Sequence, residues 1–357
     1  MFYCDCKMGC EGSVMEDPDN EYDSTWDDEY EDQKFSMMRV TKHRTRTTQR
    51  NLVAARDMQM FRHRCEKNRP VYQESHLPNL DFYQNKTPSR PDGVYIEDFH
   101  KHWLGDYTKL EKVHSYIQWL FPTQEPGVNY SAHVLTPTEI MHFHQDNTVK
   151  KRLLKSYKLM LDFYGIEMVS EITGNVQRAG NWKERFENLN RNTHNNLRIT
   201  RILKCLGLLG FRHYQAPLVY FFLNETLVYG NLPRVKQSVM DYFIFAILEK
   251  SERKNLIKFA FRCFEPKEQF VWCPIRIQRM LLKRNTPIMN HQPYSTPRVK
   301  VAHSGSQNSS RNSKVPNAGQ SKIDPRKSHP SAQNHYGNNR VQSHRTRTRV
   351  TRMDQWI

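Results

Sequence analysis

The sequence lacks any long hydrophobic run. Its longest apolar stretches, 218–223 and 242–248, are far shorter than the roughly 20 residues that a membrane-spanning helix requires. The opening residues are interrupted by Asp5, Lys7 and Glu11, so they do not form the apolar segment of a secretory signal peptide. We therefore expect a protein that is not secreted and whose association with membranes is at most peripheral.

The sequence also lacks the motifs of common enzyme classes. It contains no phosphate-binding loop, no Gly-x-Ser-x-Gly elbow and no His-Glu-x-x-His. The pairs His100/His102 and His142/His144 are each spaced by two residues, which on a helix directs the rings to nearly opposite faces. We expect a protein that is not an enzyme and that binds neither a metal nor a cofactor.

Cysteine is sparse, with seven residues in a chain of 357. Because no secretory signal accompanies them, we expect reduced thiols in a cytosolic or nuclear protein. Cys4, Cys6 and Cys10 are clustered, but no second doublet of Cys or His follows nearby, as zinc sites usually require. Free thiols are the favoured interpretation, with a metal site and reversible acylation as alternatives.

Charge is distributed unevenly along the chain. Lys and Arg number 54 against 37 Asp and Glu, for a net charge of +17. Residues 11–33 contain acids and no bases, residues 34–69 are strongly basic, and the string His43–Thr47 recurs as His344–Thr348. Basic arms of this kind favour nuclear import or phosphate binding. The candidate residues are Arg44, Arg46, Arg50, Arg345, Arg347 and Arg349.

Hydrophobic residues are concentrated in the middle of the chain. They make up 37% of the sequence and the mean hydropathy is −0.82, which is enough for one substantial core. We predict a disordered arm over residues 1–69, acidic and then basic, and a disordered basic tail over 284–357. Between them, residues 70–283 are predicted to form a single multi-helix globular domain, so the fold class is all-α with disordered charged tails.

Helix signals recur throughout residues 70–283. Thr136-Pro-Thr-Glu139 has the pattern of a capping box, Gly165 is placed to end a helix over 153–164, and Asn181 is expected to cap the next helix. Other helices are predicted over 96–103, over 110–120, from Pro217, from Pro233 and through 256–260. Short strands around 169–176 are a further possibility, with a turn at 173–175.

An amphipathic helix is predicted over 197–207. Leu197, Ile199, Ile202 and Leu203 recur at helical spacing, and basic residues lie between them. The simplest interpretation is a core helix whose basic face is solvated.

One cluster combines aromatic and acidic residues. Its members are Trp103, Asp106, Tyr107, Glu111 and Trp119. A peptide with a free amine and aromatic side chains would bind such a group, because a carboxylate pairs with the amine and the rings supply rigid contact area. The alternative is that the rings fill the core and the acids cap helices.

Two stretches point to a known family. In Ser115–Asn129 an aromatic, apolar helix end meets a loop bounded by Pro122 and Pro126, and His194–Lys204 follows some 70 residues later. Together with shorter motifs in the same order, among them Leu161–Ile166, they resemble the conserved region of the opioid growth factor receptor family over residues 79–274. Whether the receptor or its receptor-like relative is the better match stays open.

The resemblance implies a non-classical intracellular receptor for opioid growth factor, the pentapeptide Met-enkephalin. Such a protein binds the peptide, restrains cell growth and is found in the nucleus and cytoplasm, near perinuclear membranes. The resemblance implies no catalytic residue and no cofactor. The alternative is a nuclear scaffold or nucleic-acid-associated protein that uses its basic arms to bind nucleic acid or import factors.

Overall fold

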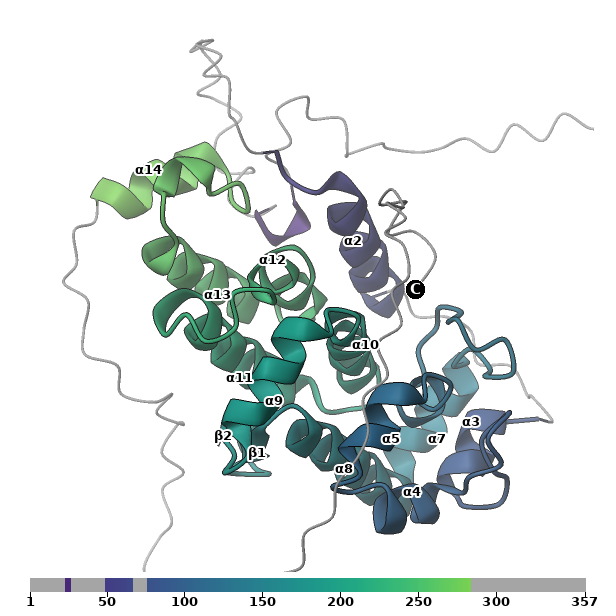
Figure 1. The fold of residues 1–357 in the computed structure, drawn as a ribbon. Coiled ribbons are helices and arrows are strands. Elements are labelled where there is room, and N and C mark those ends of the chain that lie inside the picture. The colour runs from purple at the N-terminus through teal and green to yellow at the C-terminus, as the bar shows by residue number, and fades with distance from the viewer. Residues whose placement is uncertain (1–22, 27–48, 67–75, 284–357) are drawn as a thin grey trace, which may run out of the picture. The chain divides into compact units, whose positions relative to one another are not determined.

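The computed structural model describes residues 23–26, 49–66 and 76–283. The fold is almost entirely helical (Figure 1), which confirms the predicted all-α class. The α-helices of these residues are α2 (Leu52–Glu66), α3 (Pro78–Tyr83), α4 (Ile96–His102), α5 (Tyr107–Lys112), α6 (Ile117–Leu120), α7 (Pro137–Gln145), α8 (Asn147–Phe163), α9 (Trp182–Arg191), α10 (Asn195–Leu208), α11 (Arg212–Leu223), α12 (Lys236–Ser238), α13 (Lys250–Cys263) and α14 (Ile275–Lys283).

Several short segments complete the fold. The 3₁₀ turns are η1 (Ser24–Trp26), η4 (Ile244–Ala246) and η5 (Lys267–Gln269), and the π-helical segments are η2 (Asn224–Val228) and η3 (Val239–Phe243). Strands β1 (Ile166–Met168) and β2 (Val176–Arg178) pair antiparallel and flank the predicted turn at 173–175. No helix within the described residues is both long enough and apolar enough to cross a membrane.

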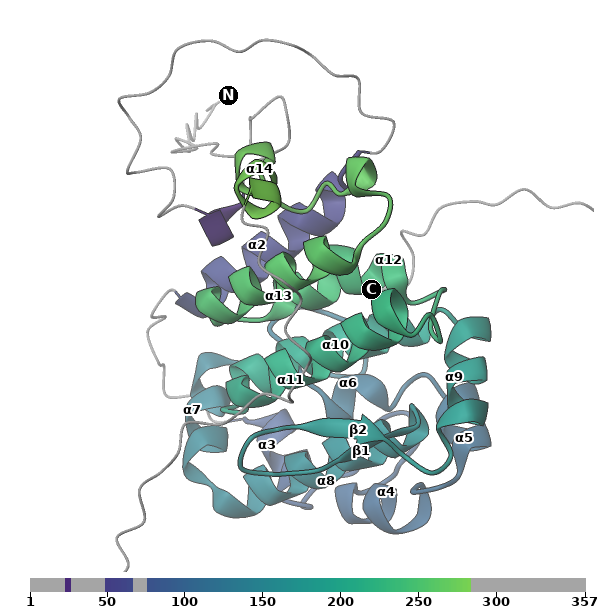
Figure 2. The ribbon, with the colours of Figure 1, turned by 90° about the vertical axis from the view of Figure 1, so that its left-hand side faces the viewer.

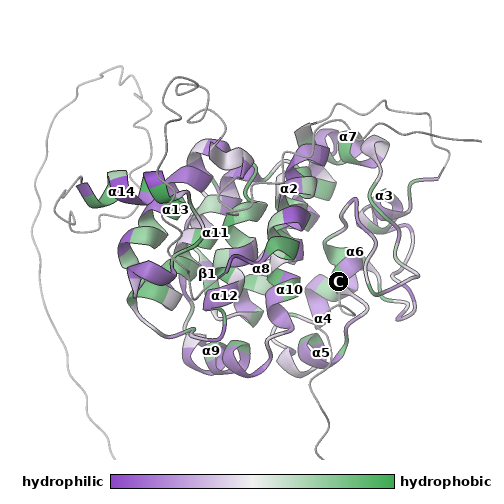
Figure 3. Ribbon diagram, turned by 90° about the horizontal axis from the view of Figure 1, so that it is seen from above, coloured by the Kyte–Doolittle hydropathy of each residue, from purple (hydrophilic) through white to green (hydrophobic). Residues whose placement is uncertain are grey.

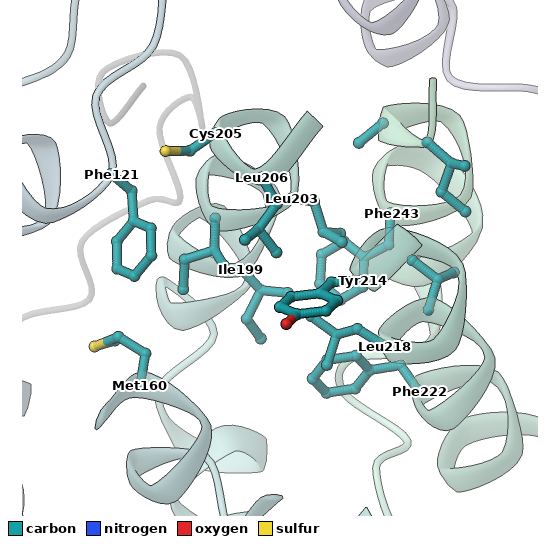
Figure 4. Close-up of a cluster of buried hydrophobic side chains, with 14 of the residues drawn as sticks. Phe121, Met160, Ile199, Leu203, Cys205, Leu206, Tyr214, Leu218, Phe222 and Phe243 are labelled. Atoms are coloured by element: carbon teal, nitrogen blue, oxygen red, sulfur yellow. The ribbon is translucent and has the colours of Figure 1, made fainter. Parts of the chain in front are cut away.

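The centre of the core is the contact between α10 and α11. Ile199, Leu203 and Leu206 of α10 face Leu218 and Phe222 of α11 (Figure 4), and all five are nearly or fully buried. Each such side chain contributes about 1.5–3 kcal/mol through burial of apolar surface. Seen from above, hydrophobic residues gather in the middle of the structure on α11 and its neighbours, whereas α9 at the periphery is largely hydrophilic (Figure 3).

The predicted helix ends that depend only on neighbouring residues are confirmed. The capping box is present: the Glu139 amide donates to Thr136 Oγ1 over 3.2 Å, and the Thr136 amide donates to Glu139 Oε2 over 3.1 Å. Glu139 is fully buried and also accepts hydrogen bonds from the backbone and side chain of Asn79. Gly165 follows α8 with φ of +76°, as a left-handed terminating residue should.

Tertiary contacts change three locally predicted features, and two of the predictions were wrong. The predicted helix over 110–120 is two helices, α5 and α6, since the backbone is extended at Val113 and the Arg198 side chain donates to the Val113 carbonyl. Asn181 does occupy the predicted N-cap position of α9. It makes no capping hydrogen bond there, because its side-chain amide donates to Tyr107 and Asp162. Pro217 lies inside α11, where burial of that helix outweighs one lost backbone hydrogen bond.

The folded part extends further toward the N-terminus than the predicted boundary at residue 70. Residues 23–26 and 49–66, which fall within the arm predicted over 1–69, pack against the helical core. Ala54, Met58 and Phe61 form a buried face of α2 at helical spacing. This face is short and surrounded by basic residues, so composition alone obscures it.

Gly165 provides a test of backbone strain. We expect Gly165→Ala to lower the free energy of unfolding by about 2 kcal/mol or more, because a left-handed alanine costs roughly 1–2 kcal/mol and its Cβ would lie 2.8 Å from Trp182 Cα. Gly180→Ala is the control: no atom lies within 4 Å of the added Cβ, and we expect a change within about 0.5 kcal/mol. Chemical denaturation measures both, and equal effects would contradict this account.

Candidate functional site

A surface pocket of about 540 Å³ lies where α5, α8, β1 and the loop before α9 meet. β1 runs beside α8, and α5 and α9 lie at the same end of the structure (Figure 2). The volume falls within the range of small-ligand sites. The pocket is lined by Tyr107, Lys158, Leu161, Asp162, Ile166, Glu167, Met168, Ala179, Gly180 and Asn181.

A hydrogen-bonded group forms one wall of the pocket. The Tyr107 hydroxyl donates to Asp162 Oδ2 over 2.9 Å, and Asn181 Nδ2 donates to the Tyr107 oxygen over 2.6 Å and to Asp162 Oδ1 over 3.2 Å. Partial burial and the adjacent Asp162 carboxylate raise the pKa of Tyr107. The Arg185 guanidinium lies 4.4 Å from the centre of the Tyr107 ring, so one face of the ring and its hydroxyl both have partners.

The pocket has an excess of negative charge. Asp162 and Glu167 face it together with a single lysine, Lys158. Lys158 forms an ion pair with Glu171, which is outside the lining set. Glu167 accepts a hydrogen bond from Gln177 Nε2 over 2.6 Å. In the part of the chain that the structure describes, no basic side chain forms an ion pair with either carboxylate. Their hydrogen-bond donors are the neutral side chains of Tyr107, Asn181 and Gln177.

Among the five residues of the predicted aromatic–acidic cluster, Tyr107 alone lines this pocket. Trp103 and Trp119 are 6% and 3% exposed and pack in the core against Phe99 and Phe82 respectively. Trp119 also donates its indole N–H to the Arg90 carbonyl over 2.9 Å. The structure therefore places both tryptophans in core packing, which was the alternative interpretation.

The two acids of the predicted cluster are occupied by their own neighbours. Asp106 caps α5 by accepting from the Lys109 amide over 3.0 Å and pairs with the Lys109 ammonium. Glu111 accepts from Asn188 and Asn195, and His194 Nε2 lies 2.6 Å from its Oε1. Glu111 thereby joins α5 to α9 and α10.

Buried cations on α10 correct the prediction of a solvated basic face. Arg198 and Lys204 are 6% and 4% exposed. Arg198 donates to the carbonyls of Leu110 and Val113 over 2.8 and 3.1 Å, and Lys204 lies 2.7 Å from Glu125. These partners lie within or beside the Ser115–Asn129 stretch, so the two stretches that carry the family resemblance contact each other.

Arg201 lies between these two cations on α10. Its Nε donates to the Phe121 carbonyl over 2.8 Å, and burial lowers the pKa of its guanidinium to about 10. The three basic residues of α10 thus hold segment 110–125 at three successive points.

The predicted basic arms are represented in the structure by one residue. Arg50 is 7% exposed, lies 3.2 Å from Asp23 and stacks over the Phe245 ring, so it is part of the fold and not a free phosphate-binding side chain. The other five predicted arginines and the cluster Cys4, Cys6 and Cys10 lie outside the described residues. Their predicted roles stay predictions.

Over residues 72–279 the sequence matches the family described as the opioid growth factor receptor (OGFr) conserved region. The match covers more than half of the chain, including both contacting stretches and the whole pocket. The chain belongs to the opioid growth factor receptor family. α2 and η1 precede the matched region, although they pack against it.

Individual relatives agree with this membership. Opioid growth factor receptor-like protein 1 of Mus musculus is 48% identical over 225 residues, covering 63% of this chain and 48% of the relative. Opioid growth factor receptor of Homo sapiens is 50% identical over 232 residues, covering 64% and 34%. Opioid growth factor receptor of Mus musculus is 45% identical over 280 residues, covering 73% and 44%. The chain therefore spans between a third and a half of these relatives' length. No solved structure matches the chain.

Sequence reasoning missed the carboxylates of the pocket. Asp162 lies within Leu161–Ile166, one of the motifs that carries the family resemblance, and this was the only signal in the sequence that pointed toward it. Glu167 follows one residue after that motif. Because the pocket forms where segments more than 50 residues apart meet, spacing alone does not reveal it.

Glu111 makes the stability of the fold depend on pH in the acid range. Partial burial alone would raise the pKa of its carboxyl, but His194, Asn188 and Asn195 outweigh burial and lower the pKa to about 2 from an ordinary value of 4.5. A depressed folded-state pKa stabilises the fold fully above pH 4.5, and this contribution is lost as the pH falls toward 2. We therefore expect the wild type to lose stability more steeply than Glu111→Gln over that interval. Parallel curves in pH-dependent denaturation would contradict this assignment.

Proposed function

We propose that this chain is a receptor for opioid growth factor, the peptide Met-enkephalin, and that the pocket beside Tyr107 receives the peptide's amino terminus. The family membership and the names of the relatives support the ligand class. The observation that carries the location is the pair of carboxylates, Asp162 and Glu167, which face a pocket with one lysine that is already paired.

The chemistry of the pocket suits a peptide ammonium group. A free amino terminus carries a positive charge and three donors, while Asp162 and Glu167 offer carboxylate oxygens at the surface. Leu161, Ile166 and Met168 supply apolar contacts, and the Tyr107 ring adds a rigid aromatic edge. Exposed ion pairs contribute only about 0.2–1 kcal/mol each, so affinity would depend on the apolar contacts as much as on charge.

Restraint of cell growth and a location in the nucleus and cytoplasm, near perinuclear membranes, are part of the same proposal. The family resemblance supports both.

Calorimetric titration of the full chain with Met-enkephalin tests the proposal. We expect saturable heat for the wild type and about two- to fivefold weaker binding for Glu167→Gln and for Asp162→Asn, from the loss of one ion pair. Glu187→Gln, at an exposed position of α9 outside the pocket, is the control and should bind like the wild type.

Peptide chemistry provides the second arm of this experiment. N-acetylated Met-enkephalin lacks the charge, so it should bind the wild type more weakly and should not distinguish the wild type from Glu167→Gln. Absence of saturable heat at millimolar peptide would contradict the proposed function. Binding that ignores both pocket variants and acetylation would contradict the proposed location.

A further inference from the structure

The four-residue segment Asp23–Trp26 lies far from the pocket, and the rest of the fold binds it through side-chain contacts of the kind that bind a peptide ligand. Asp23, Thr25 and Trp26 are at most 1% exposed, although the segment belongs to an acidic stretch of the chain. It lies beside α2 and contacts α13 (Figure 1). We call its surroundings the arginine socket, defined by Arg50, Arg62, Arg253 and Phe245.

Asp23 is the charged anchor of the segment. Arg62 Nη2 lies 3.1 Å from both of its carboxylate oxygens, and Arg50 Nη2 lies 3.2 Å from Oδ2. Burial alone would raise the pKa of Asp23, but the two guanidinium groups and the Thr25 hydrogen bonds outweigh burial and hold the pKa well below its usual range. The socket therefore selects a carboxylate at this position.

The next residues add polar and aromatic selectivity. Arg253 Nε donates to Thr25 Oγ1 over 3.0 Å, and the Ser24 amide donates to Gln59 Oε1 over 3.2 Å. Trp26 is completely buried, with the Lys254 ammonium 5.7 Å from the centre of its ring. The socket thus binds a carboxylate, a hydroxyl and a large aromatic ring within four residues, and the Trp26 indole N–H has no hydrogen-bond partner among the described residues.

Arg62 and Arg253 are also positioned by hydrogen bonds to the core. Arg62 Nη1 donates to the Phe245 carbonyl over 2.8 Å, and Arg253 Nη1 donates to the carbonyls of Ile247 and Leu248 over 2.6 and 2.8 Å. The Arg50 guanidinium lies 4.8 Å from the centre of the Phe245 ring. A vacated socket would therefore keep the Arg62 and Arg253 donors in place, and preorganised donors reduce the cost of binding.

We propose that the arginine socket is a peptide-binding site for short acidic, tryptophan-containing segments of the type Asp-x-Thr-Trp, and that Asp23–Trp26 occupies it as a tethered competitor. A partner protein that carries such a segment binds by displacing residues 23–26. This site is separate from the pocket beside Tyr107 and does not depend on the function proposed for that pocket.

Because Asp23–Trp26 is covalently attached to the chain, it competes with a free peptide for the socket and weakens the peptide's apparent affinity. We call the chain closed when this segment occupies the socket and opened when a substitution has released it. A tethered ligand acts at an effective concentration on the order of 1 mM. For a peptide with a Kd on the order of 10 μM, the tether then weakens binding in trans by about a hundredfold. Removing the tethered ligand's contacts should restore that affinity.

Fluorescence anisotropy with a labelled peptide of residues 19–30 tests the proposal on the full chain. We expect Trp26→Ala to bind the peptide at least tenfold more tightly than the wild type, with Asp23→Asn giving a smaller gain in the same direction. Peptides with the same substitutions, W26A or D23N, should lose binding to the opened chain. Circular dichroism and thermal unfolding establish whether each variant is folded. If Trp26→Ala does not fold, Asp23→Asn takes its place as the opened chain.

A substitution in the socket completes the test. In the Trp26→Ala background, Arg62→Met should abolish peptide binding, whereas Arg56→Met, at an exposed position of α2, should leave it unchanged. The proposal is overturned if folded Trp26→Ala and Asp23→Asn chains bind the peptide no better than the wild type. It is equally overturned if Arg62→Met and Arg56→Met have the same effect.

Discussion

The fold depends on buried cations of α10 that hold an irregular segment of the chain. Residues 110–125 contain only short helices, so many of their carbonyls have no helical partner. Arg198 and Arg201 supply donors to the carbonyls of Leu110, Val113 and Phe121, and Lys204 pairs with Glu125. A guanidinium offers five donors in a fixed fork, which suits it to a backbone that bends. Tyr107 of the pocket wall lies in α5, three residues before Leu110, so the Arg198 contact with Leu110 also fixes the helix that carries it.

The N-terminal segment is attached by the same chemistry. Arg62 and Arg253 each bond main-chain oxygens of 245–248 and also reach Asp23 or Thr25. Buried charges are costly unless they are paired and hydrogen-bonded. Each arginine here has several acceptors, and Nε is the one guanidinium nitrogen of Arg62 without a partner among the described residues. Basic residues that dominate the composition therefore serve partly as structural connectors inside the fold.

What could be predicted from the sequence was local. The capping box at Thr136–Glu139 and the left-handed Gly165 follow from neighbouring residues, and both are present. The break at Val113 and the burial of α10's cations result from contacts between residues some 80 positions apart, which periodicity does not encode. The same limit applies to the pocket: Tyr107 was named for its aromatic character, but Asp162 and Asn181 reach it only through the packing of α8 and the loop before α9.

Amide hydrogen exchange of wild type and Arg198→Met tests the central role of α10 most directly. Each hydrogen bond to a charged group contributes about 1.5–3 kcal/mol, so removing this guanidinium should speed exchange over 107–121 by about ten- to a hundredfold through local opening. Amides of α11 and α13 should exchange as in the wild type. Unchanged exchange over 107–121, or an equal increase throughout α11 and α13, would contradict the claim that Arg198 holds this segment.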